Sequence, residues 1–559
     1  MNSAPVSDAS PSSLEQFSGG RGEDLTAQRA ARRRFASFIP RSCRRGEARR
    51  LQGGPGSFIK KAANARFPAG RGHAARQVPG GCRGQAGEGT EPGKPIAILQ
   101  TRSTKMPASN RRKFLQASSA AGAMAFAAPS LVTRAAGANE RIRVGLVGLG
   151  GRMSSHIGSL ANMPDEVDLV AICDCDEEKL ATAEKRYPDL AGKKLKVFKD
   201  QRALFDDKEI DAVSFSTQDH WHALQTIWAC QAGKHVYVEK PPTWCIAEGR
   251  KMVEAARKYK RMVQIGTQNR SSPNVVEGMQ KLKEGVIGKL YMGRGMTYKL
   301  RGNLGKHRPR PVPKGLDWDA WVGPAQMVEY SSFQHHRWYW ISNFASGDVA
   351  NQTVHDVDKL RWGLGLDTHP TTVMSLGGRF VPAEDDDADT PNTQAFLCQW
   401  AGKNILVTFE FRHWYTNSEA GMRDKYPFVA ENQCVGEIFF GSEGYMIFPD
   451  YSSYYTFLGP KNEPGPFKTA GPGIDWRTES IPHFRNWTKA IRSGNYKDLT
   501  ADVEEGHLSC TVCHLAKISA KLGRSVHFDP KTERFVNDPE ADRFLTREYR
   551  KPYVVPDQV

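Results

Sequence analysis

The feature that most constrains the fold of this chain is an apolar strand that runs into a glycine turn, residues 141–153. Dinucleotide-binding folds carry Gly-x-Gly-x-x-Gly at this point, where the first glycine makes the tight turn and the second admits a pyrophosphate. The third glycine lets helix and strand pack closely, and Met153 stands in its place here. The motif is therefore incomplete, and alone it also fits an ordinary turn between a strand and a helix. The residues expected to contact a dinucleotide are Gly148, Gly150, Gly151, Arg152 and Met153.

A second apolar segment, residues 167–173, ends on Asp174, where dinucleotide-binding folds place an acid on the adenosine ribose hydroxyls. An acid at this position repels a 2'-phosphate, so we expect NAD rather than NADP. Three more apolar segments between residues 196 and 238 alternate with amphipathic stretches. Because strands that alternate with helices indicate a parallel sheet, the expected fold class is α/β, with a doubly wound Rossmann domain over residues 140–265.

The last of these strands stops on Glu239 and Lys240, which two prolines follow. Proline removes an amide donor and fixes φ, so the strand cannot continue. In a doubly wound sheet the carboxyl ends of the strands face the crevice where ligands bind. We therefore expect Lys240 to project into a site, and the alternative is a solvated lysine at the end of a strand. Glu239 is expected to hold this lysine or a ribose of the cofactor.

A polar turn follows the strand at residues 212–217, and it contains two histidines separated by one residue. Such a pair can bind zinc, but no further Cys or His follows at ligand spacing, so we expect no metal. Contacts with the edge of the cofactor are the preferred interpretation. The residues assigned to these contacts are Ser216, Thr217, His220 and His222, with Gln268 after the apolar segment 262–266.

These motifs and the later segment 347–358 together resemble the glucose-fructose oxidoreductase and inositol dehydrogenase (Gfo/Idh/MocA) family over about residues 140–555. The resemblance implies a second α/β domain over residues 266–555, whose open, mostly antiparallel mixed sheet often packs against a partner subunit. A homo-oligomer, either a dimer or a tetramer, is therefore expected. The resemblance also implies that Lys240 lies beside the nicotinamide and that His355 is the second catalytic position.

If residues 349–362 form a helix, Asn351, His355 and Asp358 lie on one face, at i, i+4 and i+7. The alternative to a catalytic histidine is a buried histidine paired with Asp358. Many dehydrogenases of the family carry aspartate where Asn351 stands, and an amide neither accepts nor releases a proton at neutral pH. Asn351 is therefore expected to orient a hydroxyl and not to act as the base.

The expected reaction moves a hydride from a secondary alcohol carbon to the nicotinamide while a base takes the hydroxyl proton. Such a base works best when its pKa lies near the operating pH. Lys240 qualifies if burial and the cationic nicotinamide lower its pKa, whereas His355 titrates near neutrality without such a shift. We assign proton abstraction to His355 and polarisation of the oxygen to Lys240. The reverse assignment stays open.

Aromatic and cationic residues crowd the region between residues 318 and 344. The C–H faces of sugar rings suit flat aromatic surfaces, and Arg, His and Asn suit hydroxyls, so the cluster favours a sugar, polyol or glycoside as substrate. The alternative is that these aromatic residues form a core. The expected substrate contacts are Lys240, Arg270, Arg337, Trp338, Asn351 and His355.

The net charge of +17 is concentrated near the amino terminus. Of the 78 Lys and Arg and the 61 Asp and Glu of the chain, residues 1–141 hold 24 and 8, which leaves 54 and 53 for the remainder. Residues 142–559 are therefore nearly neutral overall and lack the excess of positive charge that binds the phosphate backbone of nucleic acids. We therefore expect no nucleic-acid partner for the folded part.

Residues 1–105 show no hydrophobic periodicity, so we expect them to be disordered, or to precede a start codon that was assigned too early. From Met106 the sequence is similar to a twin-arginine signal peptide over residues 106–138, with Arg111 and Arg112 before a mildly apolar run. The run is too short and too weakly apolar to be a membrane span. We expect a periplasmic protein if translation starts at Met106, and a cytoplasmic protein otherwise.

Twin-arginine export carries folded proteins, and outside the cytoplasm no NAD pool is at hand. An exported enzyme is therefore expected to retain its NAD and to reduce again what it has oxidised. Oxidation and reduction could take place on one substrate, in a redox-neutral elimination, hydrolysis or epimerisation. Alternatively, the enzyme could oxidise one substrate and reduce a second one in turn. A sugar-binding relative without activity is the remaining alternative, because the fold alone does not decide function.

Cys510, Cys513 and His514 match the pattern at which c-type haem is attached. The match lies within residues 504–522, which we predict to be a helix with one apolar face. We therefore expect no haem.

Overall fold

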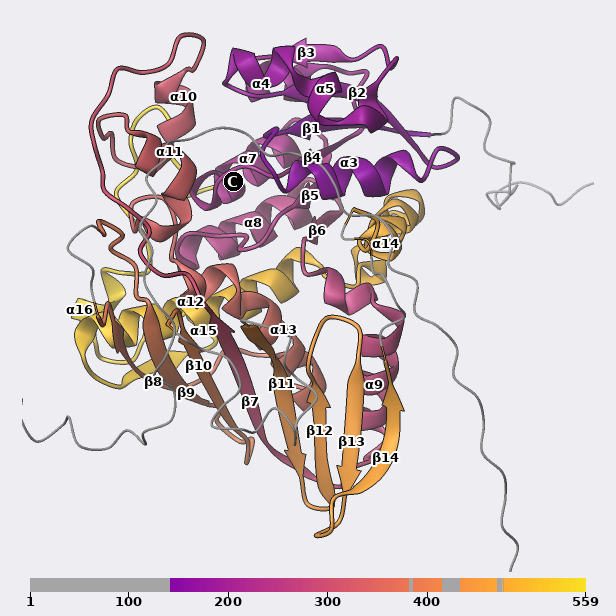
Figure 1. Ribbon diagram of the computed structural model, residues 1–559, viewed down its shortest axis with the longest axis vertical. Coiled ribbons are helices and arrows are strands. Elements are labelled where there is room, and N and C mark those ends of the chain that lie inside the picture. Colours follow the sequence, from indigo (N-terminus) through magenta and orange to yellow (C-terminus); the bar gives the residue numbers. More distant parts are fainter. Residues whose placement is uncertain (1–140, 382–385, 415–432, 470–474, 476) are drawn as a thin grey trace, which may run out of the picture. The chain divides into compact units, whose positions relative to one another are not determined.

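The computed structural model describes residues 141–381, 386–414, 433–469, 475 and 477–559 (Figure 1). The segment 1–105 and the expected signal peptide over residues 106–138 lie outside the described residues. Within the described ranges, no helix is long and apolar enough to cross a membrane.

The first sheet has six parallel strands in the order β3-β2-β1-β4-β5-β6. Apolar residues of its inner strands are buried on both faces, and Val144 and Leu146 of β1 are inaccessible to solvent. The strand order reverses between β1 and β4, which places a ligand crevice at the carboxyl ends of these strands. The strands are β1 (Ile142–Val147), β2 (Val167–Cys173), β3 (Lys196–Phe198), β4 (Ala212–Phe215), β5 (His235–Val238) and β6 (Val263–Ile265).

Helices connect these strands, and polar residues mark where several of them begin. The carboxylate of Asp200, for example, accepts a hydrogen bond from the Arg202 amide at the start of α6. The helices of this domain are α3 (Met153–Ala161), α4 (Glu177–Ala181), α5 (Ala183–Arg186), α6 (Gln201–Asp206), α7 (Asp219–Gln231) and α8 (Ile246–Lys258).

The second sheet has ten strands in the order β14-β13-β12-β11-β7-β10-β9-β8-β15-β16. Only the β7 and β10 pair is parallel among the pairs described, so the sheet is mixed and mostly antiparallel. The predicted α/β fold with these two kinds of sheet is confirmed. The strands are β7 (Leu290–Lys299), β8 (Thr372–Gly378), β9 (Thr393–Gln399), β10 (Leu406–Arg412), β11 (Gln433–Gly441), β12 (Gly444–Phe448), β13 (Tyr454–Leu458), β14 (Glu463–Lys468), β15 (Val526–Asp529) and β16 (Arg534–Phe535).

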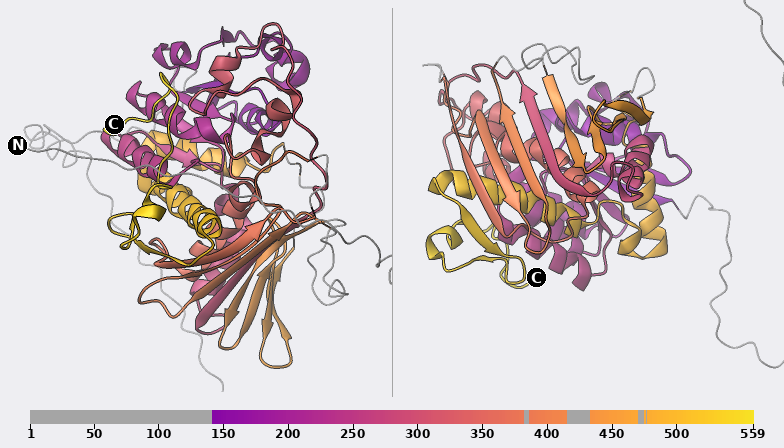
Figure 2. Two further views of the ribbon diagram at one scale, coloured as in Figure 1. Left: turned by 90° about the vertical axis from the view of Figure 1, so that its left-hand side faces the viewer. Right: turned by 90° about the horizontal axis from the view of Figure 1, so that it is seen from below.

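Helices gather on one side of the ten-stranded sheet (Figure 2). The long helices α13 (Thr353–Leu364) and α15 (Val503–Leu522) pack on β7, β8 and β11 and share one apolar core with the strands. Residues of β8 and β9 alternate between buried and exposed, so the other face of the sheet carries exposed Met374, Leu376 and Leu397. Three further α-helices on this part of the chain are α9 (Pro273–Lys283), α14 (Ile481–Ser493) and α16 (Pro539–Asp542).

The helix expected over residues 349–362 is broken. It consists of α12 (Asp348–Asn351) and α13, with Gln352 between them. In a continuous helix the His355 amide would donate to the Asn351 carbonyl, but here it donates to the Gln352 carbonyl at 3.1 Å. The break therefore frees the Asn351 carbonyl for another donor.

Between β7 and α12 the chain makes a long excursion, residues 300–347, here called the strap. It contains α10 (Trp318–Val322) and α11 (Ser332–Arg337), and the stacked rings of Trp318 and Trp321 are part of its own small core. The strap lies beside the carboxyl edge of the parallel sheet (Figure 1), where Leu316 forms a β-bridge with Asp176 just after β2.

Candidate active site

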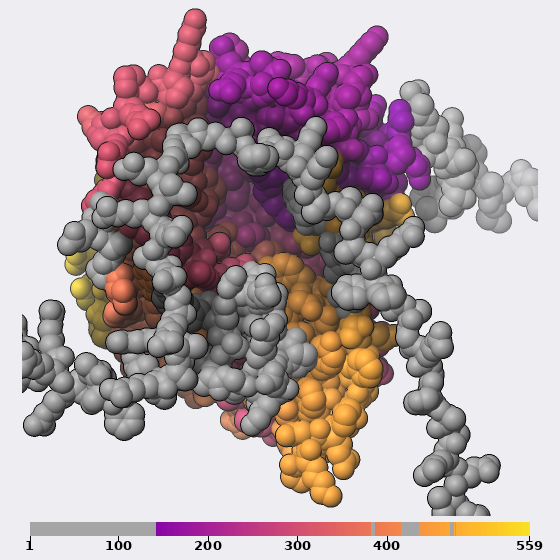
Figure 3. Space-filling view, viewed as in Figure 1, coloured from indigo at the N-terminus to yellow at the C-terminus, as the bar shows by residue number. Residues whose placement is uncertain are grey.

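A cavity of about 970 Å³ lies along the carboxyl edge of the parallel sheet. Residues that follow β1 to β5 form one wall, and residues of the strap form another, so the surface is recessed between the strap and the Rossmann domain (Figure 3). The residues predicted from the sequence that line this cavity are Gly148, Gly150, Gly151, Arg152, Asp174, Ser216, Thr217, His222, Glu239, Lys240, Trp338 and Asn351.

The glycine turn leaves open space beside the backbone. Gly148 has a φ of +86°, and a Cβ there would lie 2.7 Å from the Thr217 side chain, so only glycine fits. A Cβ on Gly150 or Gly151 would meet no atom within 4 Å and would project into free space along the cavity. This is the geometry that admits a pyrophosphate.

The predicted contact of Met153 with a dinucleotide is wrong. Its side chain is fully buried in the core with Ile157 and Leu160, so it does not face the cavity. Met153 is the first residue of α3 and packs under the helix, where its volume replaces the close helix contact that a third glycine would give.

Asp174 is held at the end of β2 with its carboxylate in the cavity wall. It accepts hydrogen bonds from the amides of Leu149, at 2.7 Å, and Asp176, at 3.0 Å. The Lys179 ammonium lies 3.6 Å from Oδ1, the oxygen that accepts from the Asp176 amide. The acid is thereby fixed beside the glycine turn, where a ribose would follow the pyrophosphate.

Lys240 reaches across the cavity wall to the break between α12 and α13. Its Nζ donates to the Asn351 carbonyl at 2.8 Å and to the Asn351 Oδ1 at 3.0 Å. Burial lowers the pKa of Lys240 more than the neighbouring Glu239 carboxylate raises it. A lysine with a lowered pKa is therefore held in place by two oxygens of one residue.

His355 lies behind this lysine and is not among the residues that line the cavity. Its Nδ1 is buried without a hydrogen-bond partner among the described residues, and its ring lies 5.6 Å from that of Tyr451. Burial and the Lys240 charge hold the pKa of His355 well below its usual range. The Asp358 carboxylate is not the hydrogen-bond partner of this histidine, because it accepts hydrogen bonds from Arg270 and Ser509.

Glu239 is held by residues other than the lysine ammonium. Arg152 donates to its Oε1 at 2.8 Å, and His156 Nε2 lies 3.0 Å from the same oxygen. Burial alone would raise the pKa of Glu239, but Arg152 and His156 outweigh it and hold the pKa well below its usual range. The glutamate is a charged partner for the arginine that follows the glycine turn.

Models of two domains of one protein family match the chain. The first is described as "Oxidoreductase family, NAD-binding Rossmann fold" and matches residues 142–267. The second is described as "Oxidoreductase family, C-terminal alpha/beta domain" and matches residues 286–391 and 466–555. Inositol 2-dehydrogenase 2 of Saccharopolyspora erythraea is 30% identical over 387 residues, which are 68% of this chain and 94% of that protein. The chain belongs to the Gfo/Idh/MocA oxidoreductase family.

Other Gfo/Idh/MocA relatives match shorter stretches. Inositol 2-dehydrogenase of Salmonella typhimurium is 32% identical over 158 residues, 28% of this chain and 46% of that protein. The chain thus spans about half the length of several curated relatives that it matches. A solved levoglucosan dehydrogenase in complex with NADH and levoglucosan shares the fold, with a TM-score of 0.53 and 19% identity over 69% of this chain and 99% of that chain. The prediction that NAD is the cofactor is confirmed by the NAD-binding Rossmann domain of the family.

Four further residues of this Gfo/Idh/MocA protein do not line the cavity, contrary to the sequence predictions. Arg270 is buried in an ion pair with Asp358, at 2.7 Å, and Gln268 donates to Glu479. Arg337 is exposed at the end of α11. His220 Nε2 lies 3.2 Å from the Trp321 carbonyl, and burial lowers its pKa to about 3.

The sequence predictions missed much of the cavity wall. The strap contributes several residues, of which His335 and His336 stack on each other with ring centroids 4.6 Å apart. The other end of the wall includes amides and aromatic rings from α6, α7 and the carboxyl terminus. Trp321, His335, His336 and Tyr339 belong to the aromatic region that the sequence analysis associated with a sugar. The principal missed residues are Gln201, Arg202, Asp219, Trp221, Gln225, Trp228 and Tyr553.

Asp219 is a buried carboxyl group in this wall. Its Oδ2 has no hydrogen-bond partner among the described residues, and burial raises its pKa to about 8 although Lys240 and Lys517 act against the rise. Burial thus favours the protonated form of this carboxyl group.

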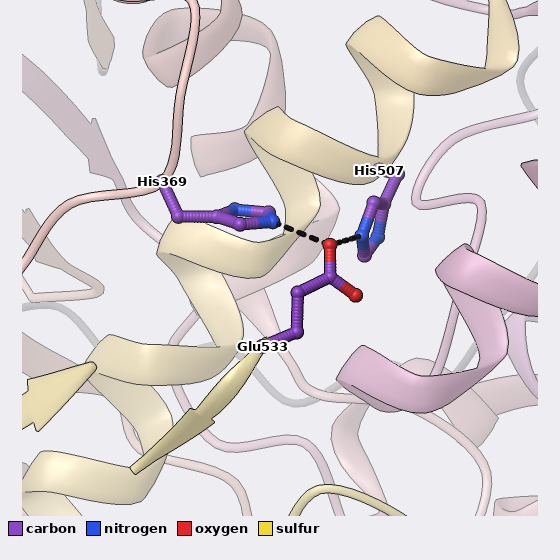
Figure 4. Close-up of side chains that lie close together, drawn as sticks. All are labelled: His369, His507 and Glu533. Atoms are coloured by element: carbon purple, nitrogen blue, oxygen red, sulfur yellow. Dashed lines mark hydrogen bonds and ion pairs between the residues drawn. The ribbon is translucent and has the colours of Figure 1, made fainter. Parts of the chain in front are cut away.

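A separate cluster joins His369, His507 and Glu533 (Figure 4). The Nε2 atoms of both histidines lie 2.9 Å from one oxygen of Glu533, and Arg250 donates to the same oxygen at 2.6 Å. A guanidinium beside the shared oxygen satisfies the carboxylate and opposes a divalent cation by charge. The cluster fits a hydrogen-bonded link between the chain before β8, α15 and the β15–β16 turn.

The haem-like motif lies inside α15. Cys510 and Cys513 are inaccessible to solvent, and Cys510 Sγ lies 3.3 Å from His514 Nε2. Covalent haem attachment requires reachable thiols, so this helix is a core element.

Proposed function

We propose that the protein oxidises a secondary hydroxyl of a sugar, polyol or glycoside with NAD. The observation that carries the proposal is the position of Lys240. This lysine lies just after a strand of the Rossmann domain, lines the cavity, and donates hydrogen bonds to two oxygens of Asn351. Relatives named for inositol and levoglucosan support a polyhydroxylated substrate.

The test is a screen of purified protein with NAD against inositols, aldoses and methyl glycosides, read as absorbance of reduced nicotinamide. Turnover of at least one of these substrates is the expected result. If NAD binds and the whole panel stays unreacted, the sugar-binding alternative without activity replaces the proposal.

Lys240 is better placed to act as the base than His355, which reverses the assignment preferred from the sequence. Bound NAD supplies the hydride acceptor. A neutral lysine has two N–H bonds, and the two oxygens of Asn351 accept both of them. The remaining lone pair is then available to a substrate hydroxyl in the cavity, and the lowered pKa of Lys240 increases the fraction of neutral amine.

His355 would then be a neutral neighbour of the reacting lysine. Its lowered pKa keeps the imidazole uncharged at neutral pH, so it adds no second cation beside Lys240.

The pH dependence distinguishes the two bases. If Lys240 is the base, kcat/KM should rise tenfold per pH unit below the lysine pKa and then level off, because only the neutral amine takes the proton. If His355 is the base, its pKa below 6.5 predicts a flat profile above that pH. The measurement is kcat/KM from pH 6 to 10, and a rising limb that persists in His355→Gln supports Lys240. A flat profile would return the role to His355.

We infer that the protein is exported and keeps its NAD during turnover, so that the net reaction is redox-neutral. The strap supports retention, since its backbone bonds to the chain after β2 and covers the cavity. Native mass spectrometry of protein purified without added NAD should show one bound dinucleotide per chain. Nucleotide-free protein that turns over only with added NAD would contradict retention.

We propose that the exposed face of the ten-stranded sheet is a subunit interface. Leu376 is 62% exposed and lies on β8 with exposed Met374, which pairs with exposed Leu397 of the neighbouring strand β9. Light scattering should give a dimer or tetramer that Leu376→Glu dissociates, while the same change at exposed Val197, on the edge strand of the other sheet, leaves the mass unchanged. A monomeric wild-type protein would contradict the proposal.

A further inference from the structure

The carboxyl-terminal tail, residues 547–559, closes one end of the cofactor cavity. Tyr553 lines the cavity and is only 8% exposed, and its ring meets that of Trp221 edge to face at 5.3 Å. Trp228 stands next to Trp221, with ring centroids 6.0 Å apart. The amides of Gln201 and Gln225 lie in the same wall and hydrogen-bond each other at 2.5 Å. This end of the cavity offers flat aromatic surfaces and amide groups to a heterocyclic base.

The tail is tied to the strap at several residues, and Asp319 takes part in more of these hydrogen bonds than any other strap residue described. The Tyr553 hydroxyl donates to Asp319 Oδ2 at 3.1 Å, and Arg550 pairs with Oδ1 at 2.5 Å. Arg550 also donates to the carbonyls of Asp319, at 2.7 Å, and Gly323, at 3.0 Å. The tail therefore touches both the cavity and the element that covers it.

The strap is in turn attached on both sides of the cavity. On the β2 side, the Glu177 amide donates to the Gly315 carbonyl at 3.0 Å and the Asp317 amide to the Cys175 carbonyl at 2.9 Å. On the α7 side, the Trp221 indole lies 3.1 Å from the Trp321 carbonyl. Gly323 packs so closely on Trp221 that a Cβ there would lie 2.2 Å from the ring.

We propose that the strap and the tail form a latch, joined at Asp319, that encloses the adenosine half of NAD and sets the rate at which NAD exchanges. In this arrangement Asp174 binds the ribose and Tyr553 and Trp221 border the adenine. The inference rests on NAD as the cofactor and gives the proposed retention of NAD a structural cause.

The latch is built to open without unfolding the domain. The Asp319 side chain is 57% exposed, and ion pairs that face water are individually weak because solvent screens them. Tyr553 and Val555, in contrast, pack into the core of the Rossmann domain, so the tail stays attached when the strap lifts. The bonds at Asp319 are therefore among the contacts that must break when the strap lifts, together with those of Gln326 and Asn343 to the tail.

The test is the dissociation rate of NADH, followed by the loss of its fluorescence when loaded protein is mixed with excess NAD. Tyr553→Ala, which removes both the ring and the hydroxyl, is expected to raise the rate by about tenfold or more, which corresponds to 1.4 kcal/mol per factor of ten. Asp319→Asn and Tyr553→Phe keep the ring and should raise it about threefold, since only the link is lost.

The matched control is Tyr496→Ala, because this tyrosine stacks under Arg257 and does not line the cavity. Hydrogen exchange of residues 313–323 supplies a second readout, and faster exchange in Asp319→Asn is expected if the link holds the strap down. If Tyr553→Ala does not fold, the NADH dissociation rates of Asp319→Asn and Tyr553→Phe test the latch. Dissociation rates within twofold of wild type in all folded variants would overturn the latch.

Failure of retention and failure of the latch can be told apart. If the wild-type protein is purified without NAD and releases NADH quickly, the proposed retention of NAD is wrong. The ratio of the NADH dissociation rates of the variants and the wild type still tests the latch in that case. Slow release in wild type and in every variant contradicts the latch and leaves retention standing.

Discussion

Replacing Lys240 with methionine is expected to lower kcat for hydride transfer by roughly 10² to 10⁴ while NAD stays bound. Methionine has a similar length but neither donates nor accepts the reacting proton, so the two oxygens of Asn351 lose their donor. The groups proposed to hold NAD, which are the glycine turn and Asp174, do not depend on this side chain. Stopped-flow reduction of bound NAD with a substrate from the sugar screen measures the effect.

A matched control is Lys281→Met, which removes an exposed lysine that pairs with Glu284 on α9, away from the cavity. This variant should keep wild-type rates. If Lys240→Met reduced NAD as fast as the wild type, Lys240 would be a solvated lysine at a strand end and the proposed base would be wrong.

Replacing Lys359 with methionine is expected to be among the most destabilising single changes in the chain. Lys359 and Glu437 are inaccessible to solvent, and their charged atoms lie 2.6 Å apart. Removing one partner of a buried pair leaves the other unpaired, which costs about 3 to 5 kcal/mol of unfolding free energy. Because α13 carries both Lys359 and His355, the loss should also loosen the region behind Lys240.

The destabilisation should depend on pH. Burial raises the pKa of Glu437 well above its usual 4.5 although the Lys359 charge opposes the rise. Without Lys359 this opposition is lost, so the folded variant binds a proton more tightly at Glu437 than the wild type does, and the unfolded chain releases that proton. The variant is therefore least affected near pH 4.5 and below, and stability falls as pH rises above it. Urea unfolding at pH 5 and pH 8 measures this difference.

Adding Glu437→Gln to Lys359→Met should restore most of the stability, because an amide carries no charge and can donate to the adjacent Asp356. An equal loss of stability in the single and the double variant would show that packing, and not the ion pair, holds α13 on the sheet.

The sequence was informative where a function is encoded in a few adjacent residues. Asp174 and Lys240 each lie within two residues of the end of an apolar strand. Parallel strands bring their carboxyl ends to one edge of the sheet, so both side chains could be placed in one crevice. The six-stranded sheet was predictable for the same reason, because alternation of strands and helices is a local signal.

Long-range contacts were not predictable in this way. Nothing near Tyr553 or Asp319 in the sequence indicates that residues 234 positions apart meet at the cofactor cavity. Arg270 was expected near substrate because it follows a strand, but a partner from a distant helix, Asp358, pairs with it in the interior. Some aromatic residues of the strap pack in its own core and others line the cavity, and the amino-acid composition does not indicate which residues do which.

The broken helix at Gln352 has a consequence for sequence variation. The shorter of the two contacts to Lys240 comes from the main-chain carbonyl of Asn351, and every amino acid supplies such a carbonyl. The side chain at this position can therefore change, for instance between amide and carboxylate, and alter the charge beside the lysine without releasing it. In evolutionary terms, position 351 can adjust the basicity of the lysine while the backbone preserves where the lysine stands.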